Sequence, residues 1–218
     1  MISIDYIISA VPQLFRGMGI AIVFTIVAIS LSILSASILN IIRSANIRLM
    51  SVLIVIYVTY IRGTPMLVQL YIIYYLLPNI GIKLPAYVAG MLAIVLNSGA
   101  IMYGVIRGSI LSIPLGQYEA AVSYGLRKID IWRSVLLPQA MIKVLPQIIN
   151  ETIILLKATP LLAFITIVEV FRSAQLIYAT NYRPVETLIG AAILFFIINY
   201  SLSKLGIRVE EKLKRRRG

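Results

Sequence analysis

The sequence predicts an all-α integral membrane protein with about five transmembrane helices. Hydrophobic residues make up 60% of the 218-residue chain and charged residues only 13%, whereas soluble domains are roughly 45–50% apolar and about 25% charged. Several long stretches are almost free of charge and reach the ~20 residues that a helix needs to cross a bilayer. The formal net charge is +12, from 20 Lys and Arg against 8 Asp and Glu, so the positions of these cations relative to the membrane need to be explained.

The first two expected spans lie before residue 78. Residues 17–42 carry no charge and form the first span, after a short interfacial lead-in over residues 1–13. The lead-in lacks the basic start and the small-residue cleavage site of a signal peptide. The second span is expected over residues 49–77 with Arg62 inside it, because the charge-free part before Arg62 is too short to cross alone.

A third span is expected over residues 84–106, closed by Arg107. The following segment, residues 108–143, changes character: charges alternate with short apolar runs, and Gly and Pro interrupt the pattern. It is predicted to form short helices outside the bilayer, joined by a turn at Gly125, with Asp130 as the cap of the second helix.

The fourth span is expected over residues 144–174, with a kink at Pro160, since proline cannot donate the backbone hydrogen bond of a helix. Glu169 and Arg172 are three residues apart and are expected to pair on one helix face, with gating or docking of an external protein as the alternative.

The fifth span is expected over residues 187–205, followed by a basic tail at residues 206–218. We therefore predict one transmembrane domain over residues 1–218, with the N-terminus outside and the C-terminus in the cytoplasm.

That orientation follows from the excess of cations on the cytoplasmic side of a membrane protein. The outside would hold Arg16, Lys83 and Arg183. Fourteen of the 20 cations would then be cytoplasmic: Arg43, Arg48, Arg107, Arg127, Lys128, Arg133, Lys143, Lys204, Arg208, Lys212, Lys214, Arg215, Arg216 and Arg217. The basic tail is thus interpreted as a topology signal and a contact for anionic lipid, with no nucleic acid as partner.

Cysteine and histidine are both absent from the sequence. Thiol nucleophiles, disulfides, histidine-based catalysis and Cys/His metal sites are therefore excluded. A phosphate-binding loop of the G-x-x-x-x-G-K-[ST] type is also missing. The chain is expected to be no enzyme, with no catalytic residue, metal or cofactor of its own, so that any ATP and Mg²⁺ would be bound by partner subunits.

The cytoplasmic segment contains a spaced motif: Glu-Ala-Ala at 119–121, three residues, Gly125, nine residues, and Val-Leu-Leu-Pro at 135–138. It resembles the EAA loop of the membrane permease subunits of ABC importers, with Val135 in place of the usual Ile. The resemblance implies that this loop docks into a cleft on the ATPase subunit. The residues assigned to coupling are Gln117, Glu119, Ala120, Ala121, Gly125, Leu137 and Pro138.

Further motifs resemble permeases for polar amino acids of the histidine, glutamine, arginine and cystine type. They are Arg-Gly-Thr-Pro-Met-Leu-Val-Gln at 62–69, Asn-Ser-Gly-Ala at 97–100 with Tyr103, and Asn-Glu at 150–151 with Leu-Leu-Lys-Ala-Thr at 155–159. Two positions depart from the family pattern: Gly104 stands where an acid is common, and Pro160 where Ser is usual.

Charged groups inside a bilayer cost roughly 2.5–3.5 kcal/mol each and therefore face protein or an aqueous cavity. Glu151 and Lys157 are six residues apart, roughly 240° around a helix, so they cannot pair with each other. We expect them to meet the amino and carboxylate groups of the substrate; the alternative is that Lys157 snorkels and Glu151 pairs with a loop arginine. The full set of expected substrate contacts is Asn97, Ser98, Tyr103, Glu151, Lys157 and Thr159.

A second group, Arg62, Thr64, Pro65 and Gln69, is expected to line an outer vestibule or to bend the second span. The resemblance implies a permease subunit of an amino acid importer that works by alternating access. Its partners would be a second permease chain, identical or similar, two cytoplasmic ATPase subunits, an extracytoplasmic amino-acid-binding protein and membrane lipid. Two alternatives are an ion-gradient-driven secondary transporter that uses Glu151 or Glu169, and a membrane scaffold without transport activity.

Overall fold

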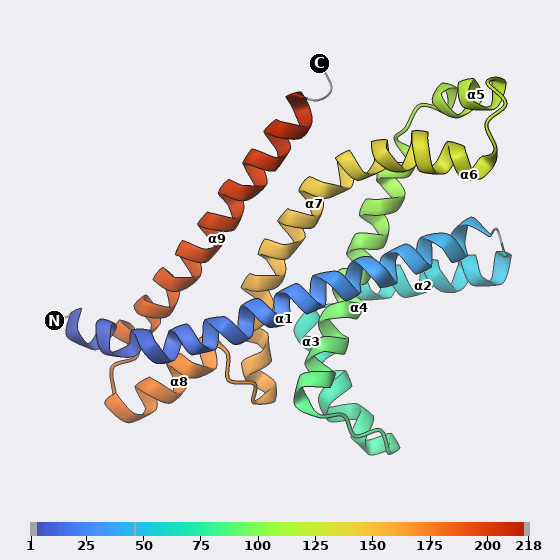
Figure 1. Ribbon diagram of the computed structural model, residues 1–218. Helices are drawn as coiled ribbons and strands as arrows, with labels where there is room; N and C mark the ends of the chain where they lie inside the picture. The colour runs from blue at the N-terminus through green and yellow to red at the C-terminus, as the bar shows by residue number, and fades with distance from the viewer. Residues whose placement is uncertain (1–3, 46, 216–218) are drawn as a thin grey trace.

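The computed structural model describes residues 4–45 and 47–215, and all the regular structure in these ranges is helical. Figure 1 shows long helices crossing one another, with a separate pair of short helices, α5 and α6, at one end of the molecule. The elements in chain order are α1 (Ile4–Ser44), α2 (Arg48–Gly63), α3 (Met66–Tyr71), η1 (Ile72–Leu76), η2 (Leu77–Ile80), α4 (Ala86–Leu111), α5 (Leu115–Ser123), α6 (Lys128–Ile131), η3 (Trp132–Leu136), α7 (Leu137–Ala158), η4 (Thr159–Ile165), α8 (Val170–Asn181) and α9 (Pro184–Arg215).

Four of the helical segments are long and apolar enough to cross a membrane: Ile4–Ser44, Ala86–Leu111, Lys128–Ile165 and Pro184–Leu213. A fifth crossing results if the bent pair Arg48–Gly63 and Met66–Ile80 counts as one span. The all-helical class with four to five candidate spans is therefore confirmed.

Helices α1 and α4 form the centre of the packing because their facing residues are small. On α1, Ala28 and Ala36 are fully buried in the same core cluster as Ala89 and Ala93 on α4. Such small side chains let two helix backbones approach closely, which is the usual basis of helix association in a membrane.

Gly99 marks one point of close approach on α4. A Cβ at this position would lie 2.5 Å from the Ser35 Oγ of α1, so a larger residue would require the Ser35 side chain to move.

Several expected boundaries are corrected by the structure. The lead-in is not a separate element, since α1 begins at Ile4 and passes through Pro12 without interruption. The second span is bent, as one of the two alternatives for Arg62, Thr64, Pro65 and Gln69 predicted, and its two halves meet at 109°. Helix α4 continues past Arg107 to Leu111. The tail is not a separate segment either, since α9 runs to Arg215; Arg216 and Arg217 lie outside the described residues.

The fourth span ends earlier than expected. Helix α7 stops at Ala158, and Thr159–Ile165 follows as a tighter 3-10 helix that starts at the predicted kink site, Pro160. Thr166 then takes a left-handed conformation with φ of 68°, which ends the helix and turns the chain. Residues 170–174 therefore belong to α8 and not to the span.

Candidate functional site

The bend between α2 and α3 is set by Gly63, Thr64 and Pro65. Thr64 is extended, with φ of −119° and ψ of 144°, because the ring of a following proline disfavours the helical conformation. Pro65 caps α3 at its N-terminal end with φ of −63°. The break leaves carbonyl groups at the end of α2 without helical partners, and such groups must be satisfied inside a membrane.

Gln69 satisfies these groups with its side chain, which is only 4% exposed. Its Nε2 lies 2.8 Å from the carbonyl oxygen of Ile61, 3.0 Å from that of Thr64 and 2.8 Å from the Thr64 Oγ1. The Thr64 hydroxyl in turn donates to the carbonyl of Tyr60 at 2.9 Å. The bend is therefore held by hydrogen bonds across it.

Asn97 connects this bend to the middle of α4, because its Nδ2 donates to the Gln69 Oε1 at 3.0 Å. Asn97 lines a cavity of about 570 Å³, a size typical of small-molecule sites, and Gln69 lies behind it without being a lining residue. The cavity is lined by Ile61, Arg62, Thr64, Asn97, Ile101, Gly104 and Val105.

The guanidinium group of Arg62 lies over Gly104 at one wall of this cavity. Its Nη1 is 3.7 Å from the point where a Cβ of Gly104 would stand. A larger residue at position 104 would meet the arginine directly. The cavity therefore combines one cation, hydroxyl and amide groups, and apolar walls, and no carboxylate is among its lining residues.

Glu151 and Ser98 form a second polar spot, between α7 and α4. They are 5% and 0% exposed, and the Ser98 hydroxyl lies beside the Glu151 carboxyl group. In the described part of the chain, neither the Ser98 Oγ nor the Glu151 Oε1 has a hydrogen-bond partner of good geometry. Because an unsatisfied buried polar group costs about 1–3 kcal/mol, this arrangement requires a functional or structural explanation.

The other expected contacts lie elsewhere. Lys157 is exposed near the end of α7 and does not join the cavity around Arg62. Thr159 is 1% exposed and its hydroxyl donates to the carbonyl of Leu156 at 2.8 Å. Tyr103 is packed in the core, where its backbone carbonyl accepts a hydrogen bond from the Nδ2 of Asn40.

Asn40 and Tyr57 are polar residues that sequence reasoning missed. Asn40 joins α1 to α4 through the bond to Tyr103, at 3.2 Å, and the Tyr57 hydroxyl donates to the carbonyl of Leu96 at 2.7 Å. The signal for Asn40 was an amide inside the uncharged residues 17–42, where a polar side chain needs a partner.

The expected coupling segment forms a compact unit with its own small core. Ala121 packs with residues of α6, η3 and α7, and the buried members of this core are Ile113, Ala121, Ile131, Leu136 and Ala140. Gln117, Glu119 and Ala120 point outward and are exposed. Lys143 attaches the unit to α4, because its Nζ donates to both the carbonyl and the hydroxyl of Ser112, at 3.0 and 2.7 Å.

Gly125 ends α5 as expected, in a left-handed conformation with φ of 74°. The N–H of Gly125 donates to Val122 and that of Leu126 to Ala121, the paired bonds of a Schellman motif. The prediction that Asp130 caps α6 is wrong. Arg127 occupies the cap position, and its Nε forms an ion pair with Asp130 at 2.8 Å.

Leu137 and Pro138 stand in the first turn of α7 and are exposed. Proline is tolerated there because its missing N–H would have no helical partner in the first turn of a helix. The C-terminal part of the expected loop, residues 137–143, therefore forms the beginning of helix α7.

Glu169 does not pair with Arg172, in contrast to the prediction. Its buried carboxylate caps α8 by accepting the backbone N–H groups of Phe171 at 2.9 Å and Arg172 at 2.8 Å. The Arg172 side chain instead donates to Gln175 at 3.0 Å. Burial raises the pKa of the Glu169 carboxyl above its ordinary value, and the N–H groups of the helix end oppose that shift.

Comparison with known proteins agrees with this architecture. The sequence model of the binding-protein-dependent transport system inner membrane component family matches residues 28–215. The L-cystine transport system permease protein of Bacillus subtilis is 37% identical and is covered over 88% of its length by 94% of this chain. The arginine transport system permease protein of the same organism is 31% identical, with 95% of each chain covered.

Two solved structures resemble the fold closely. An amino acid ABC transporter crystallised with histidines matches with a TM-score of 0.92 and 30% identity, over 97% of this chain and 99% of that one. The MetNI methionine ABC transporter in an inward-facing conformation matches with a TM-score of 0.72 and 20% identity, over 92% and 96% of the two chains.

Proposed function

The chain belongs to the family of binding-protein-dependent transport system inner membrane components, and we propose that its substrate passes the cavity at the bend between α2 and α3. As a member it is a multi-pass inner membrane protein and the permease subunit of an ATP-driven amino acid ABC importer. ATP hydrolysis takes place on separate ATPase subunits. This family membership decides against the ion-driven transporter and the scaffold.

The proposed substrate site is centred on Arg62, Thr64, Gln69 and Asn97. The observation that supports it most is the bond between Gln69 and Asn97, which joins the bend to α4 beside a polar cavity. A guanidinium group matches the geometry of a substrate carboxylate and binds it with two parallel hydrogen bonds.

Glu151 and Lys157 complete the proposed path. We assign Glu151, with its unsatisfied Oε1, to the substrate amino group, and the exposed Lys157 to the carboxylate at another stage of transport. Ser98 lies beside Glu151, while Tyr103 and Thr159 support the path from buried positions.

The absence of a carboxylate among the lining residues of the cavity favours neutral or polar amino acids over cationic ones. Gly104 contributes to this preference because it stands where permeases of this type commonly carry an acid. The relatives named above are described for L-cystine and for arginine, so the substrate of this chain is a matter for direct measurement.

For assembly, we propose a dimer of two permease chains, identical or similar, with an extracytoplasmic amino-acid-binding protein. The ATPase subunits would dock on the coupling surface, defined as Gln117, Glu119, Ala120, Gly125, Leu137 and Pro138, while Ala121 packs in the small core beneath it. Its support is the exposed outer face of α5, carried on a rigid small core. The C-terminus would be cytoplasmic and the N-terminus outside, as the distribution of cations favours. Closure of the ATPase pair would then reorient the spans around the cavity.

The experiment is uptake of radiolabelled amino acids by proteoliposomes that contain the assembled importer, supplied with ATP and the binding protein. Arg62→Gln should lower uptake about tenfold or more, because a hydrogen bond to a charged group contributes about 1.5–3 kcal/mol. Arg48→Gln, at the exposed start of the same helix, is the matched control and should transport normally. Normal uptake by Arg62→Gln, with normal ATPase binding, would refute the assignment.

A further inference from the structure

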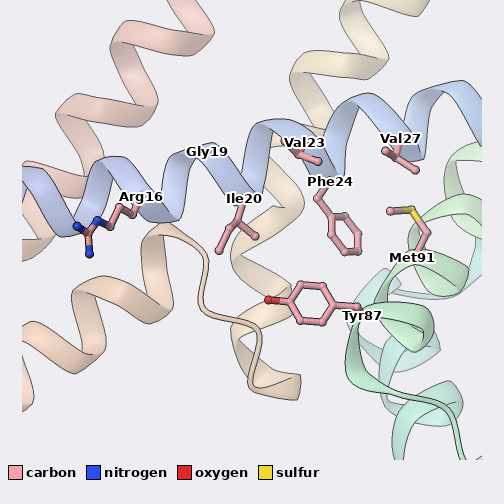
Figure 2. Close-up of a pocket in the computed structure, with 8 residues that line it drawn as sticks. All are labelled: Arg16, Gly19, Ile20, Val23, Phe24, Val27, Tyr87 and Met91. Carbon is pink, nitrogen blue, oxygen red and sulfur yellow. The ribbon is translucent and has the colours of Figure 1, made fainter.

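A long apolar groove runs between α1 and α4 on the outside of the molecule (Figure 2). Its first part has a volume of about 490 Å³ and is lined by Arg16, Gly19, Ile20, Val23, Phe24, Val27, Tyr87 and Met91. A second hollow of about 440 Å³ shares Tyr87 and Met91 and continues along Leu31, Val88, Leu92 and Val95. The groove is therefore continuous over several turns of both helices.

The charge of the groove is confined to one end. The Arg16 side chain is exposed there, and its guanidinium group forms neither a hydrogen bond nor an ion pair within residues 4–45 and 47–215. Figure 2 shows the Tyr87 ring with its hydroxyl directed toward the same side, while the remaining side chains are hydrocarbon or thioether. A guanidinium group thus stands at one end of an apolar channel, and the phenol of Tyr87 lies further along it, where the two hollows meet.

The depth of Arg16 matches the membrane surface in the orientation proposed above, on which this inference rests. Arg16 is the last charge before the uncharged residues 17–42. From Arg16 to Val27 a helix rises about 16 Å, at 1.5 Å per residue, and this equals about half of a ~30 Å hydrocarbon core. The first part of the groove therefore has the length of one leaflet.

Gly19 keeps the groove open next to Arg16. No atom lies within 4 Å of the position where a Cβ of Gly19 would stand. Val23 and Val27, one and two turns further on, are 63% and 41% exposed. The walls of the groove are thus accessible from outside the molecule.

We propose that this groove binds one phospholipid of the outer leaflet, with its phosphate on Arg16 and one acyl chain along Ile20, Val23 and Val27. Arginine binds phosphate through two charge-assisted hydrogen bonds, and the Tyr87 hydroxyl is a further donor for the headgroup.

A second copy of this chain fits the groove less well, because it has few acids to offer Arg16. On the proposed outer side, Glu169 and Glu186 are 0% and 5% exposed, and Asp5 is three helical turns away from Arg16.

The test is lipid binding to the purified permease–ATPase complex, delipidated in detergent and titrated with phosphatidylglycerol under native mass spectrometry. We expect one retained lipid per permease chain. Arg16→Gln should weaken binding about fivefold, the effect of one cation at a phosphate surface. Gly19→Leu, whose side chain enters open space, should weaken it by blocking the groove. Diacylglycerol with the same acyl chains should bind the unmodified complex as weakly as phosphatidylglycerol binds Arg16→Gln.

Lys83→Gln is the matched control, because Lys83 is exposed and does not line the groove. Equal affinities for Arg16→Gln and Lys83→Gln, or unchanged binding by Gly19→Leu, would overturn the proposal. So would cross-linking of two chains through Val23→Cys, which is readily tested because the sequence contains no cysteine. Lipid binding is measured without transport, so failure here is distinguishable from failure of the proposed substrate path.

Discussion

Two Thr-Pro pairs interrupt the membrane helices of this protein, and the backbone adopts a different conformation at each. At Thr64-Pro65 the chain is extended and the flanking helices meet at 109°. The side chain of Gln69, from the following helix α3, satisfies the freed carbonyl groups. At Thr159-Pro160 the chain stays helical, with φ of −56° and ψ of −29°, and tightens into a 3-10 helix. There the Thr159 hydroxyl satisfies the neighbouring carbonyl of Leu156.

The Thr-Pro dipeptide alone therefore does not determine whether the chain bends sharply or stays helical. The first break is preceded by Gly63 and followed by an amide that reaches back across it and on to Asn97. The second break closes within one turn and needs no partner from another helix. The break at Thr64-Pro65 is closed by side chains of α3 and α4, and the cavity of about 570 Å³ lies beside it.

The largest effect is expected for Gln69→Leu. This change removes the donor to two carbonyls and a hydroxyl and the acceptor of Asn97, so it should lower the stability of the permease by about 3 kcal/mol or more and abolish uptake. The measurement is thermal unfolding and uptake of the reconstituted importer. Gln147→Leu, on an exposed face of α7, is the matched control. An unchanged melting temperature would show that the bend does not depend on this closure.

Asn97→Ala should have the next largest effect. It breaks the link to Gln69 but leaves the bonds across the bend, so we expect a stability loss of about 1 kcal/mol. Uptake should fall more steeply than stability, because the amide also faces the cavity. The comparison is between initial uptake rates and unfolding midpoints of the same preparations. A proportional loss of both would indicate that Asn97 is only a packing residue.

The coupling surface gives a prediction outside the two breaks. Gly125→Ala places a side chain on a residue with φ of 74° and should cost about 1 kcal/mol, distorting the turn that carries α5. Co-purification of ATPase subunits should decrease severalfold, while the cavity stays intact. Gly108→Ala, where no neighbour crowds a Cβ, is the control. Full ATPase binding by the Gly125 variant would contradict the assigned role of this turn.

The smallest effects on stability are expected for substitutions of Thr64 and Thr159. Because one threonine stands at each break, these substitutions allow a direct comparison of the two breaks. Thr159→Val removes one local hydrogen bond and should cost about 0.5–1 kcal/mol with little change in uptake. Thr64→Val removes an acceptor of Gln69 as well, so its stability loss should exceed that of Thr159→Val. Equal losses, measured by thermal unfolding, would mean that the two breaks are energetically alike.

The sequence predicted the helical class and the approximate spans, because charge and hydropathy determine which segments enter a bilayer, whereas the polar residues of the bend were indicated by the resemblance of residues 62–69 to a permease motif. It did not connect Arg62, Thr64 and Gln69 with Asn97, since residues 28 apart meet only through the packing of α3 on α4. A bend of the second span was one of the two alternatives for Arg62, Thr64, Pro65 and Gln69, but its size of 109° could not be predicted, because hydropathy does not report the direction of a helix.

The error at Glu169 has a different cause. A carboxylate three residues before an arginine pairs with it if both are inside a helix, but caps the helix if it stands at its start. The left-handed conformation of Thr166 determines where α8 starts, and no residue pattern in the sequence predicts a positive φ at a threonine. The position of the start of α8 thus determines whether Glu169 pairs with Arg172 or caps the helix.

The central claim, that substrate occupies the cavity at the first break, is tested most directly by thiol labelling. The sequence contains no cysteine, so Ile101→Cys provides a single label in the cavity wall, and Val122→Cys provides one on the exposed face of α5 as a control. In the assembled, transporting importer, a transported amino acid should slow labelling at position 101 severalfold and leave position 122 unchanged. Equal labelling rates at position 101 with and without substrate would contradict the account.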